Sequence, residues 1–183
     1  MRNNRVMYVT QTAVMLAVLI AVQFVTRSMV FFVTGSLVNM ILLVSVFMIG
    51  LGGGLTIAIL SPFLAAFVGV GPAFIQIVPF VAVANAILVL VAWPARKRIM
   101  FNGPGDVLFT AVNLIIAGAA KMAFLWVALV LIALPFIPGV TKQQISVIGF
   151  TFSWPQLVDA IIGGALAMLI VPLLRRAMKL SKI

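Results

Sequence analysis

The chain has no cysteine, no histidine and only two acidic side chains, Asp106 and Asp159, among its 183 residues. Without cysteine it can form no disulfide, no thiolate and no sulfur-ligated metal site. Without histidine, and with only two carboxyl groups, it lacks the usual side chains of general acid–base catalysis and of metal binding. We therefore expect a protein that is not an enzyme and that binds no metal or cofactor of its own.

Charged residues are scarce as well, since they make up 8% of the chain while 65% of it is apolar. Soluble domains average about 45–50% apolar and about 25% charged residues. A water-soluble fold of this length could not hide so much apolar surface. The apolar stretches are long and do not alternate with polar residues, which predicts an all-α integral membrane protein rather than a β-barrel.

Six apolar stretches are candidates for membrane spans, at residues 10–25, 36–49, 55–68, 74–93, 107–134 and 155–174. The glycines at 50–54 predict a tight turn, and Pro79 predicts a kink in the fourth stretch. The segment 135–154 is longer and more polar, and we expect it to fold over the mouth of a cavity. We interpret residues 1–183 as a single six-helix transmembrane domain.

Three clusters of basic residues indicate an orientation. Two bases lie in the N-terminal tail, three lie at residues 96–98, and four lie after residue 174. Four predicted spans separate the first cluster from the second, and two separate the second from the third. All three clusters therefore lie on one side of the membrane, and the positive-inside rule makes that side cytoplasmic. We expect six transmembrane helices with both termini in the cytoplasm.

Three alanines recur every four residues in the first span, at Ala13, Ala17 and Ala21. This spacing places three small side chains on one helix face, where another helix can approach closely. Two interpretations stay open at this point. The face packs inside this protein, or it docks a partner subunit.

A few polar side chains inside the predicted spans are candidates for a binding site. Lys121 lies deep in the fifth span, where a lysine costs at least about 2.5 kcal/mol, so it should face a cavity or a partner. Gln156 and Asp159 lie near the start of the sixth span, where an acid can also act as a helix cap. Gln76 and Asn85 lie in the fourth span, and a helix–helix hydrogen bond is the simpler explanation of a buried amide.

We expect a ligand site in the outer half, between the fourth, fifth and sixth spans, roofed by residues 135–154 and 27–35. The candidate substrate-binding residues are Gln76, Asn85, Lys121, Trp154, Gln156 and Asp159. A few polar groups in an apolar cavity are typical of a small-molecule site, although Trp154 can equally belong to an interfacial aromatic belt. At about 1.5 Å per residue, Lys121 lies about 20 Å below the outer end of its span. Asp159 is expected much nearer the surface, so a small ligand should touch only one of the two charges.

Several short motifs add to this pattern. They are AVMLA at residues 13–17, GLGGGL at 50–55, LSPF at 60–63 and VPF at 78–80, with Asn85 after them. With these motifs, six predicted spans, cytoplasmic termini and a basic tail, the chain resembles the substrate-binding S component of an energy-coupling factor (ECF) vitamin transporter. The resemblance covers essentially the whole chain.

The resemblance implies a multi-pass cell-membrane protein that captures a vitamin from outside with high affinity. It also implies docking through Ala13, Ala17 and Ala21 on a transmembrane coupling subunit, which two cytoplasmic ATPase subunits drive. The chain itself has no ATP-binding motif, because no Lys-Ser/Thr follows its glycine run. ATP is therefore expected to act only on the partner subunits.

The overall look is closest to cobalamin-type members of Gram-positive bacteria, and pantothenate or another vitamin is the alternative substrate. A stand-alone carrier or channel is the alternative from another class. Ion-coupled carriers often contain internal repeats and acids at the membrane midplane. The chain has no clear repeat and only one acid inside a span, which favours the transporter subunit.

Overall fold

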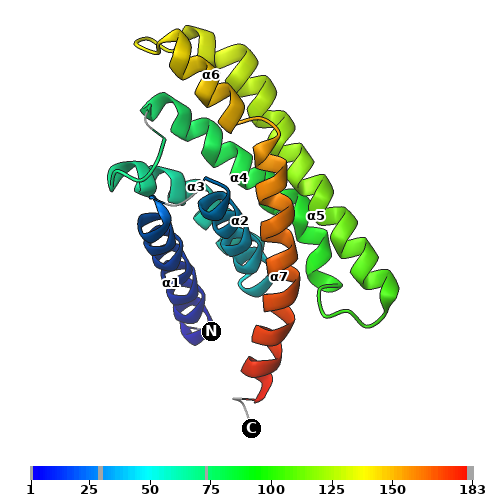
Figure 1. The fold of residues 1–183 in the computed structure, drawn as a ribbon. Coiled ribbons are helices and arrows are strands. Elements are labelled where there is room, and N and C mark those ends of the chain that lie inside the picture. Colours follow the sequence, from blue (N-terminus) through cyan, green and yellow to red (C-terminus); the bar gives the residue numbers. More distant parts are fainter. Residues whose placement is uncertain (1, 29–30, 73, 181–183) are drawn as a thin grey trace.

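The computed structural model describes residues 2–28, 31–72 and 74–180, and over these residues it contains helices and no strand. The α-helices are α1 (Arg2–Thr26), α2 (Phe31–Met48), α3 (Leu51–Phe67), α4 (Val78–Ala92), α5 (Pro104–Phe124), α6 (Lys142–Thr151) and α7 (Pro155–Leu180). Short helical segments of other types are η1 (Ile75–Ile77), η2 (Trp93–Lys97), η3 (Leu125–Ala133) and η4 (Leu134–Phe136). Figure 1 shows their arrangement. The all-helical prediction is confirmed.

Four segments of the described chain are long and apolar enough to cross a membrane, namely Arg5–Thr26, Ile75–Lys97, Pro104–Phe136 and Lys142–Met178. Two further apolar helices are shorter, Phe32–Met48 and Leu51–Phe67. Seventeen residues of helix are about 25 Å long, slightly less than the hydrocarbon core of about 30 Å. The membrane class follows from these segments, while the count of six spans stays a prediction.

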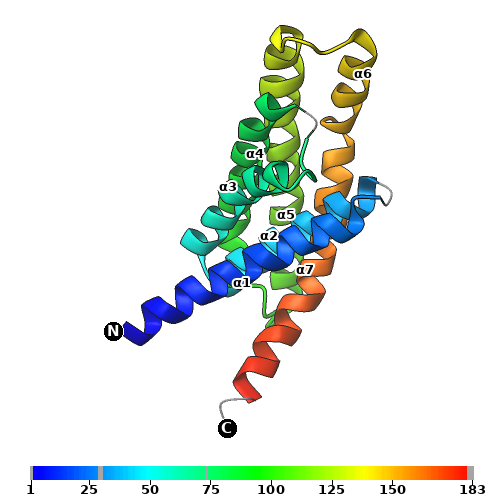
Figure 2. The same cartoon turned by 90° about the vertical axis from the view of Figure 1, so that its left-hand side faces the viewer.

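The centre of the molecule is the pair α2 and α7, against which the other helices are arranged. α5 packs on α7, α4 lies between α3 and α5, and α1 packs on α2 and α3. Figure 2 shows α1 crossing the bundle obliquely at one side. A side chain on Gly163 of α7 would bring its Cβ within 2.6 Å of the Ser36 carbonyl oxygen of α2. Glycine at this position therefore permits close contact between α2 and α7.

The glycines at residues 50–54 serve two purposes rather than one. Gly50 has a φ of +116° and makes the turn between α2 and α3. The next three glycines belong to the first turn of α3, where Gly53 and Gly54 pack closely on Ile49 and Val46. The predicted turn is therefore shorter than expected, and α3 begins at residue 51 instead of 55.

Other boundaries also differ from those predicted. α2 begins at Phe31 rather than at residue 36, and Pro79 lies in the first turn of α4, where it starts the helix instead of kinking it. The segment 135–154 is not a simple loop, because it contains α6. Thr141 and Gln144 form a capping box at the start of α6.

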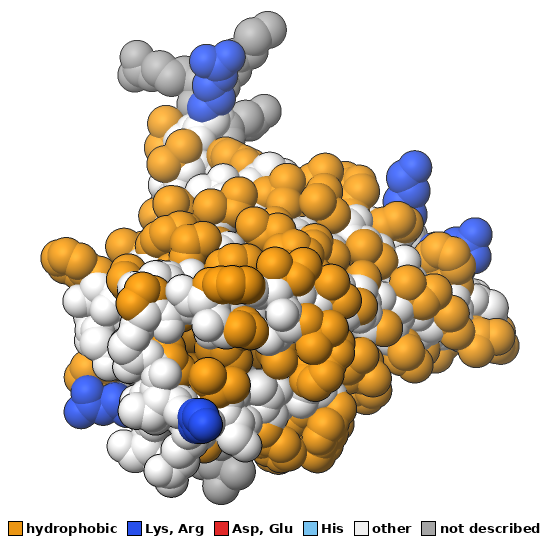
Figure 3. All heavy atoms as spheres, turned by 90° about the horizontal axis from the view of Figure 1, so that it is seen from above, with side chains coloured by type: hydrophobic (Ala, Val, Ile, Leu, Met, Phe, Trp, Pro, Cys, Tyr) orange, Lys and Arg blue, Asp and Glu red, His pale blue; other side chains and the backbone are white. Residues whose placement is uncertain are grey.

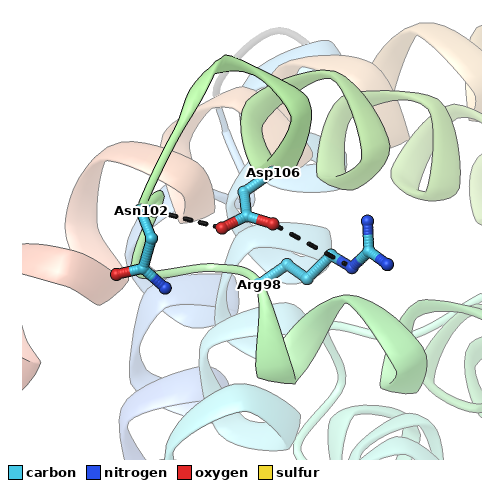
Figure 4. A network of polar contacts seen from close by, with 3 residues as sticks. All are labelled: Arg98, Asn102 and Asp106. Carbon is cyan, nitrogen blue, oxygen red and sulfur yellow. Dashed lines mark hydrogen bonds and ion pairs between the residues drawn. The ribbon is translucent and has the colours of Figure 1, made fainter.

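The start of α1, the end of α7 and the turn between η2 and α5 lie towards the same end of the molecule (Figure 1). In that turn Asp106 accepts a hydrogen bond from the backbone N–H of Asn102 at 3.1 Å and lies 4.0 Å from Nε of Arg98 (Figure 4). The three basic clusters thus share one end, as the six-span prediction requires. Its cytoplasmic location stays a prediction.

Large apolar side chains cover much of the outer surface, as Figure 3 shows for the face seen from above Figure 1. Phe67, Leu108 and Leu169 are at least two-thirds exposed. In water such a surface would be an aggregation hazard, whereas lipid solvates it. Inside, Leu42, Leu43 and Phe47 of α2 are completely buried and form part of the main hydrophobic core.

Candidate substrate-binding cavity

A cavity of about 470 Å³ lies beside the end of α1 and the start of α7, at the opposite ends of these two helices from their basic clusters. Its walls come from the end of α1, the start of α2, the end of α3, the segment before α4, the first half of α4, and the end of α6 with the start of α7. Apolar walls include Val38, Phe74, Ile77, Val81 and Phe152. A mostly apolar concavity of this size is typical of a site for a small organic molecule.

Lys121 of α5 lines the cavity and is almost completely buried, with 4% of its surface exposed. Its ammonium group donates a hydrogen bond to Oδ1 of Asn39 on α2 at 2.7 Å. An ammonium group has three N–H donors, and this bond uses one of them. Lys121 therefore faces a cavity rather than lipid, as its position in the sequence predicted.

Asp159 of α7 lies behind the cavity wall and is fully buried. Its Oδ1 accepts a hydrogen bond from the Ser36 hydroxyl at 3.5 Å, and its Oδ2 has no partner among the described residues. The carboxylate packs directly on the backbone of Gly35, because a Cβ there would collide with it. Gly35 thus provides the space for a buried acid between α2 and α7.

Lys121 and Asp159 are opposite charges at the place where α5 meets α7, since Gly118, three residues before Lys121, packs on Ala160, the residue after Asp159. This arrangement corrects the predicted separation in depth. α6 packs beside η3, so the chain has already turned back before α7 begins. The start of α7 consequently lies nearer to Lys121 than a count along the fifth span suggested.

Amide side chains supply the remaining polar lining. Asn85 of α4 is 2% exposed, and its Oδ1 has no partner within the part of the chain that is described. Oε1 of Gln23 on α1 is in the same state. Gln156 also lines the cavity, but its Nε2 donates to the Thr151 carbonyl oxygen at 3.1 Å. Two buried amide oxygens beside the cavity therefore lack a hydrogen-bond partner among the described residues.

Besides Asp159, two more of the six predicted site residues lie outside this lining. Gln76 in η1 is exposed, and Trp154 is 52% exposed. The Trp154 ring stacks at a tilt on Phe32, with a centroid distance of 6.2 Å, and meets Phe150 edge-on at 5.6 Å. Trp154 therefore helps to hold the start of α2 and the end of α6 together beside the cavity.

The cavity brings together residues that the prediction did not select. Gln23 comes from the end of α1, a helix assigned only to packing or docking. The 27–35 region was expected as a roof, and Arg27, Thr34 and Gly35 do line the cavity. The polar Gln23 within an apolar span was the signal in the sequence that could have pointed to this role.

The alanine face of α1 is exposed. Ala13, Ala17 and Ala21 all lie on the outer surface, beside the exposed apolar side chains of Val14 and Val18. No other helix of the described chain covers this face. Internal packing, one of the two interpretations left open, is therefore not what this face does.

An all-helical membrane protein with a mostly apolar cavity and a few buried polar groups has the features of a substrate-binding subunit of a transporter. The chain matches the family described as "ECF transporter, substrate-specific component" over residues 11–175. Because the match covers most of the chain, the protein belongs to this family. Neither a curated protein nor a solved structure matches it.

Membership in this family settles the class of the protein. It is the substrate-binding membrane component of a transporter and not a member of an enzyme family. The family also implies association with an ECF module that comprises transmembrane and ATPase subunits. The alternative of a stand-alone carrier or channel is therefore set aside, whereas the substrate is not given by the family.

Proposed function

We propose that this chain captures a small, carboxylate-bearing vitamin in the 470 Å³ cavity and delivers it to an ECF module docked on α1. The observation that carries the proposal is the polar lining. It contains two cations, Lys121 and Arg27, and the amide side chains of Asn85 and Gln23, but no carboxylate among the described lining residues. A lining with cations and no acid favours an anion over a neutral or cationic substrate.

The size of the cavity bears on the choice between cobalamin and pantothenate. Pockets of about 300–1,000 Å³ hold drug-sized ligands, and this cavity lies in the lower half of that range. A corrinoid with its nucleotide loop is far larger than a drug-sized molecule. The volume therefore favours pantothenate or another small acid, the alternative in the sequence-based prediction, over cobalamin.

Charge points in the same direction. Lys121 has two N–H donors left after its bond to Asn39, and a carboxylate is the strongest acceptor for them. Arg27 is exposed and lines the cavity from the end of α1, where it can attract an anion before binding. One carboxylate can thus interact with a cation during entry and with another once it is bound.

Two further observations support docking through α1. The alanine face has small side chains at a spacing that allows close helix contact, and it is uncovered in the isolated chain. α1 also contributes Gln23 to the cavity, and Arg27 follows directly after the helix. A partner that shifts α1 would therefore change the cavity wall, which offers a direct way to couple docking to substrate release.

Mass spectrometry of small molecules retained by the purified chain tests the substrate class. We expect an acid of low molecular mass, and Arg27→Gln should retain less of it than the matched control Lys142→Gln. Both changes remove one exposed base, but only Arg27 lines the cavity. A retained corrinoid would overturn the small-acid proposal and leave the S-component assignment intact.

A second experiment tests docking separately. Ala17→Trp places a bulky ring on the exposed alanine face, whereas Ala123→Trp places the same ring on an exposed site of α5. Uptake by whole cells should fall only for Ala17→Trp, and ligand binding by the isolated chain should survive in both variants. Equal uptake by the two variants would remove α1 as the docking face.

A further inference from the structure

A second cavity, of about 560 Å³, lies at the other end of α2. Gly35 lines the first cavity and Phe47 lines the second, so about 18 Å of helix separates them at about 1.5 Å per residue. The second cavity has a basic wall of Arg96, Lys97 and Arg175 and an apolar wall that includes Met48, Met100 and Met178. It is therefore both positively charged and partly apolar.

Two of these bases are fixed by the end of α2. The Phe47 carbonyl oxygen accepts hydrogen bonds from Nε of Arg96 at 3.1 Å and from Nη2 of Arg175 at 2.7 Å. Nη1 of Arg175 also donates to the Arg96 carbonyl oxygen at 3.4 Å. The last carbonyls of a helix lack partners within it and carry about half a negative charge. Helix capping thus explains why both arginines are there.

Capping does not balance their charge. Arg96, Lys97 and Arg175 bring three positive charges against about half a negative charge from the helix end. The two acidic side chains of the chain are both engaged elsewhere. Asp106 pairs with Arg98, as Figure 4 shows, and Asp159 lies near Lys121 at the other cavity. About two and a half of the three positive charges at this cavity therefore remain unbalanced, because neither acidic side chain lies there.

Arg96 also has hydrogen-bond donors that the protein does not use. Arg96 makes one hydrogen bond, which leaves its two terminal nitrogens without an acceptor among the described residues. Its guanidinium lies 5.0 Å from the centre of the Trp93 ring, and this contact limits its movement. A guanidinium fork with both terminal nitrogens free matches the oxygens of a phosphate group.

The surroundings identify the kind of molecule that carries the phosphate. The cavity lies where α2, η2 and α7 approach the end of the bundle, and the exposed Leu173 and Leu174 immediately precede Arg175 on α7. Trp93 is of the residue type that concentrates at the membrane surface. A basic cluster at the membrane surface can bind the charged headgroup of a lipid, and the apolar helix surface beside it can contact the acyl chains.

We propose that Arg96, Lys97 and Arg175 form a binding site for the phosphate of an anionic phospholipid in the leaflet at this end of the protein. The site is independent of the transported substrate, because it lies at the opposite end of α2. The bound headgroup supplies the negative charge that the sequence lacks there. It also ties the ends of α2, η2 and α7 together.

Native mass spectrometry of the detergent-purified chain tests the site, with phosphatidylglycerol, phosphatidylcholine and glycerol 3-phosphate as probes. Phosphatidylglycerol should bind more tightly than phosphatidylcholine. Each cation near a lipid surface contributes about a fivefold increase in affinity, so Arg96→Gln/Lys97→Gln should bind phosphatidylglycerol about 25-fold more weakly. The matched control is Arg5→Gln/Arg176→Gln, which removes two exposed bases outside the cavity and should lose much less than about 25-fold, because neither base lies at the proposed phosphate site.

If the double variant unfolds, the single variant Lys97→Gln tests the lipid site instead. Lys97 is exposed and makes no hydrogen bond within the described chain, so its replacement should leave the fold intact. It should weaken phosphatidylglycerol binding about fivefold. Equal weakening in the cavity variant and its control would overturn the proposal and leave the arginines as caps of α2. Displacement of phosphatidylglycerol by glycerol 3-phosphate would instead assign the phosphate site to a soluble anion and overturn its assignment to lipid.

Discussion

Positive charge lies near both ends of α2, and its source of neutralising negative charge differs between the two ends. At the end near Gly35, the protein buries a positive charge on Lys121 and supplies its own negative charge on Asp159. At the end near Phe47, it gathers Arg96, Lys97 and Arg175 without an acid. A charge deep in the membrane needs a partner from the same protein, whereas a charge at the membrane surface can use one from the surroundings.

The comparison also separates two uses of polarity in a very apolar chain. Lys121 of the buried pair faces a cavity of limited size, which suits selective binding of one small molecule. The surface cluster is open and multiply charged, which suits a less selective attraction to phosphate. Each prediction below changes one end and leaves the other as its internal reference.

The largest expected effect concerns the sides of the membrane. Because the chain has no cysteine, Asn102→Cys and Gln143→Cys each introduce a single reactive thiol at an exposed position. In intact cells an impermeant thiol reagent should label Gln143→Cys and leave Asn102→Cys unlabelled. Labelling of both from outside would contradict the six-span arrangement and place the two ends of α2 on the same side.

The next effect concerns the buried pair. Lys121→Met leaves Asp159 buried without a counter-charge, and breaking such a pair typically costs about 3–5 kcal/mol of unfolding free energy. Lys121→Met/Asp159→Asn removes both charges and should recover much of that loss. Thermal unfolding in detergent measures both variants. A double variant no more stable than Lys121→Met would show that the two charges do not compensate each other.

A smaller effect is expected at the other end. Arg175→Gln removes the shorter of the two hydrogen bonds to the Phe47 carbonyl oxygen, and hydrogen bonds to charged groups contribute about 1.5–3 kcal/mol. Arg176→Gln removes the neighbouring exposed charge and should change the unfolding free energy by less than about 0.5 kcal/mol. The same unfolding assay compares them, and equal values would remove the capping role of Arg175.

Composition and periodicity were sufficient to predict the all-helical membrane fold, because long apolar runs have few alternatives in lipid. They were also sufficient to select Lys121 as a residue that must avoid lipid. Its neighbours were not predictable, since they depend on how far α6 folds back beside η3 before α7 starts. A count of residues along the fifth span cannot show how far the chain folds back before the sixth span begins.

The same limit applies to the cavity lining. Asn85 and Gln156 are polar residues in apolar spans and could be selected from the sequence, and both line the cavity. Gln76 has the same character but lies in η1, at the surface. The direction of a side chain at a helix end depends on where the helix begins, and helix boundaries are the part of a sequence-based prediction that is least certain. Gln23 was missed because α1 was assigned to packing or docking alone.

The most direct test of the proposed substrate site is to fill the cavity and measure the small molecule that the purified chain retains. Val81→Trp places a large ring in the cavity wall, and Val83→Trp places the same ring on the exposed face of the same helix. We predict that Val81→Trp retains at least about tenfold less ligand, a loss of about 1.4 kcal/mol in binding free energy, while Val83→Trp matches the unaltered chain. Equal retention by both variants in the folded state would contradict the assignment of this cavity as the substrate site.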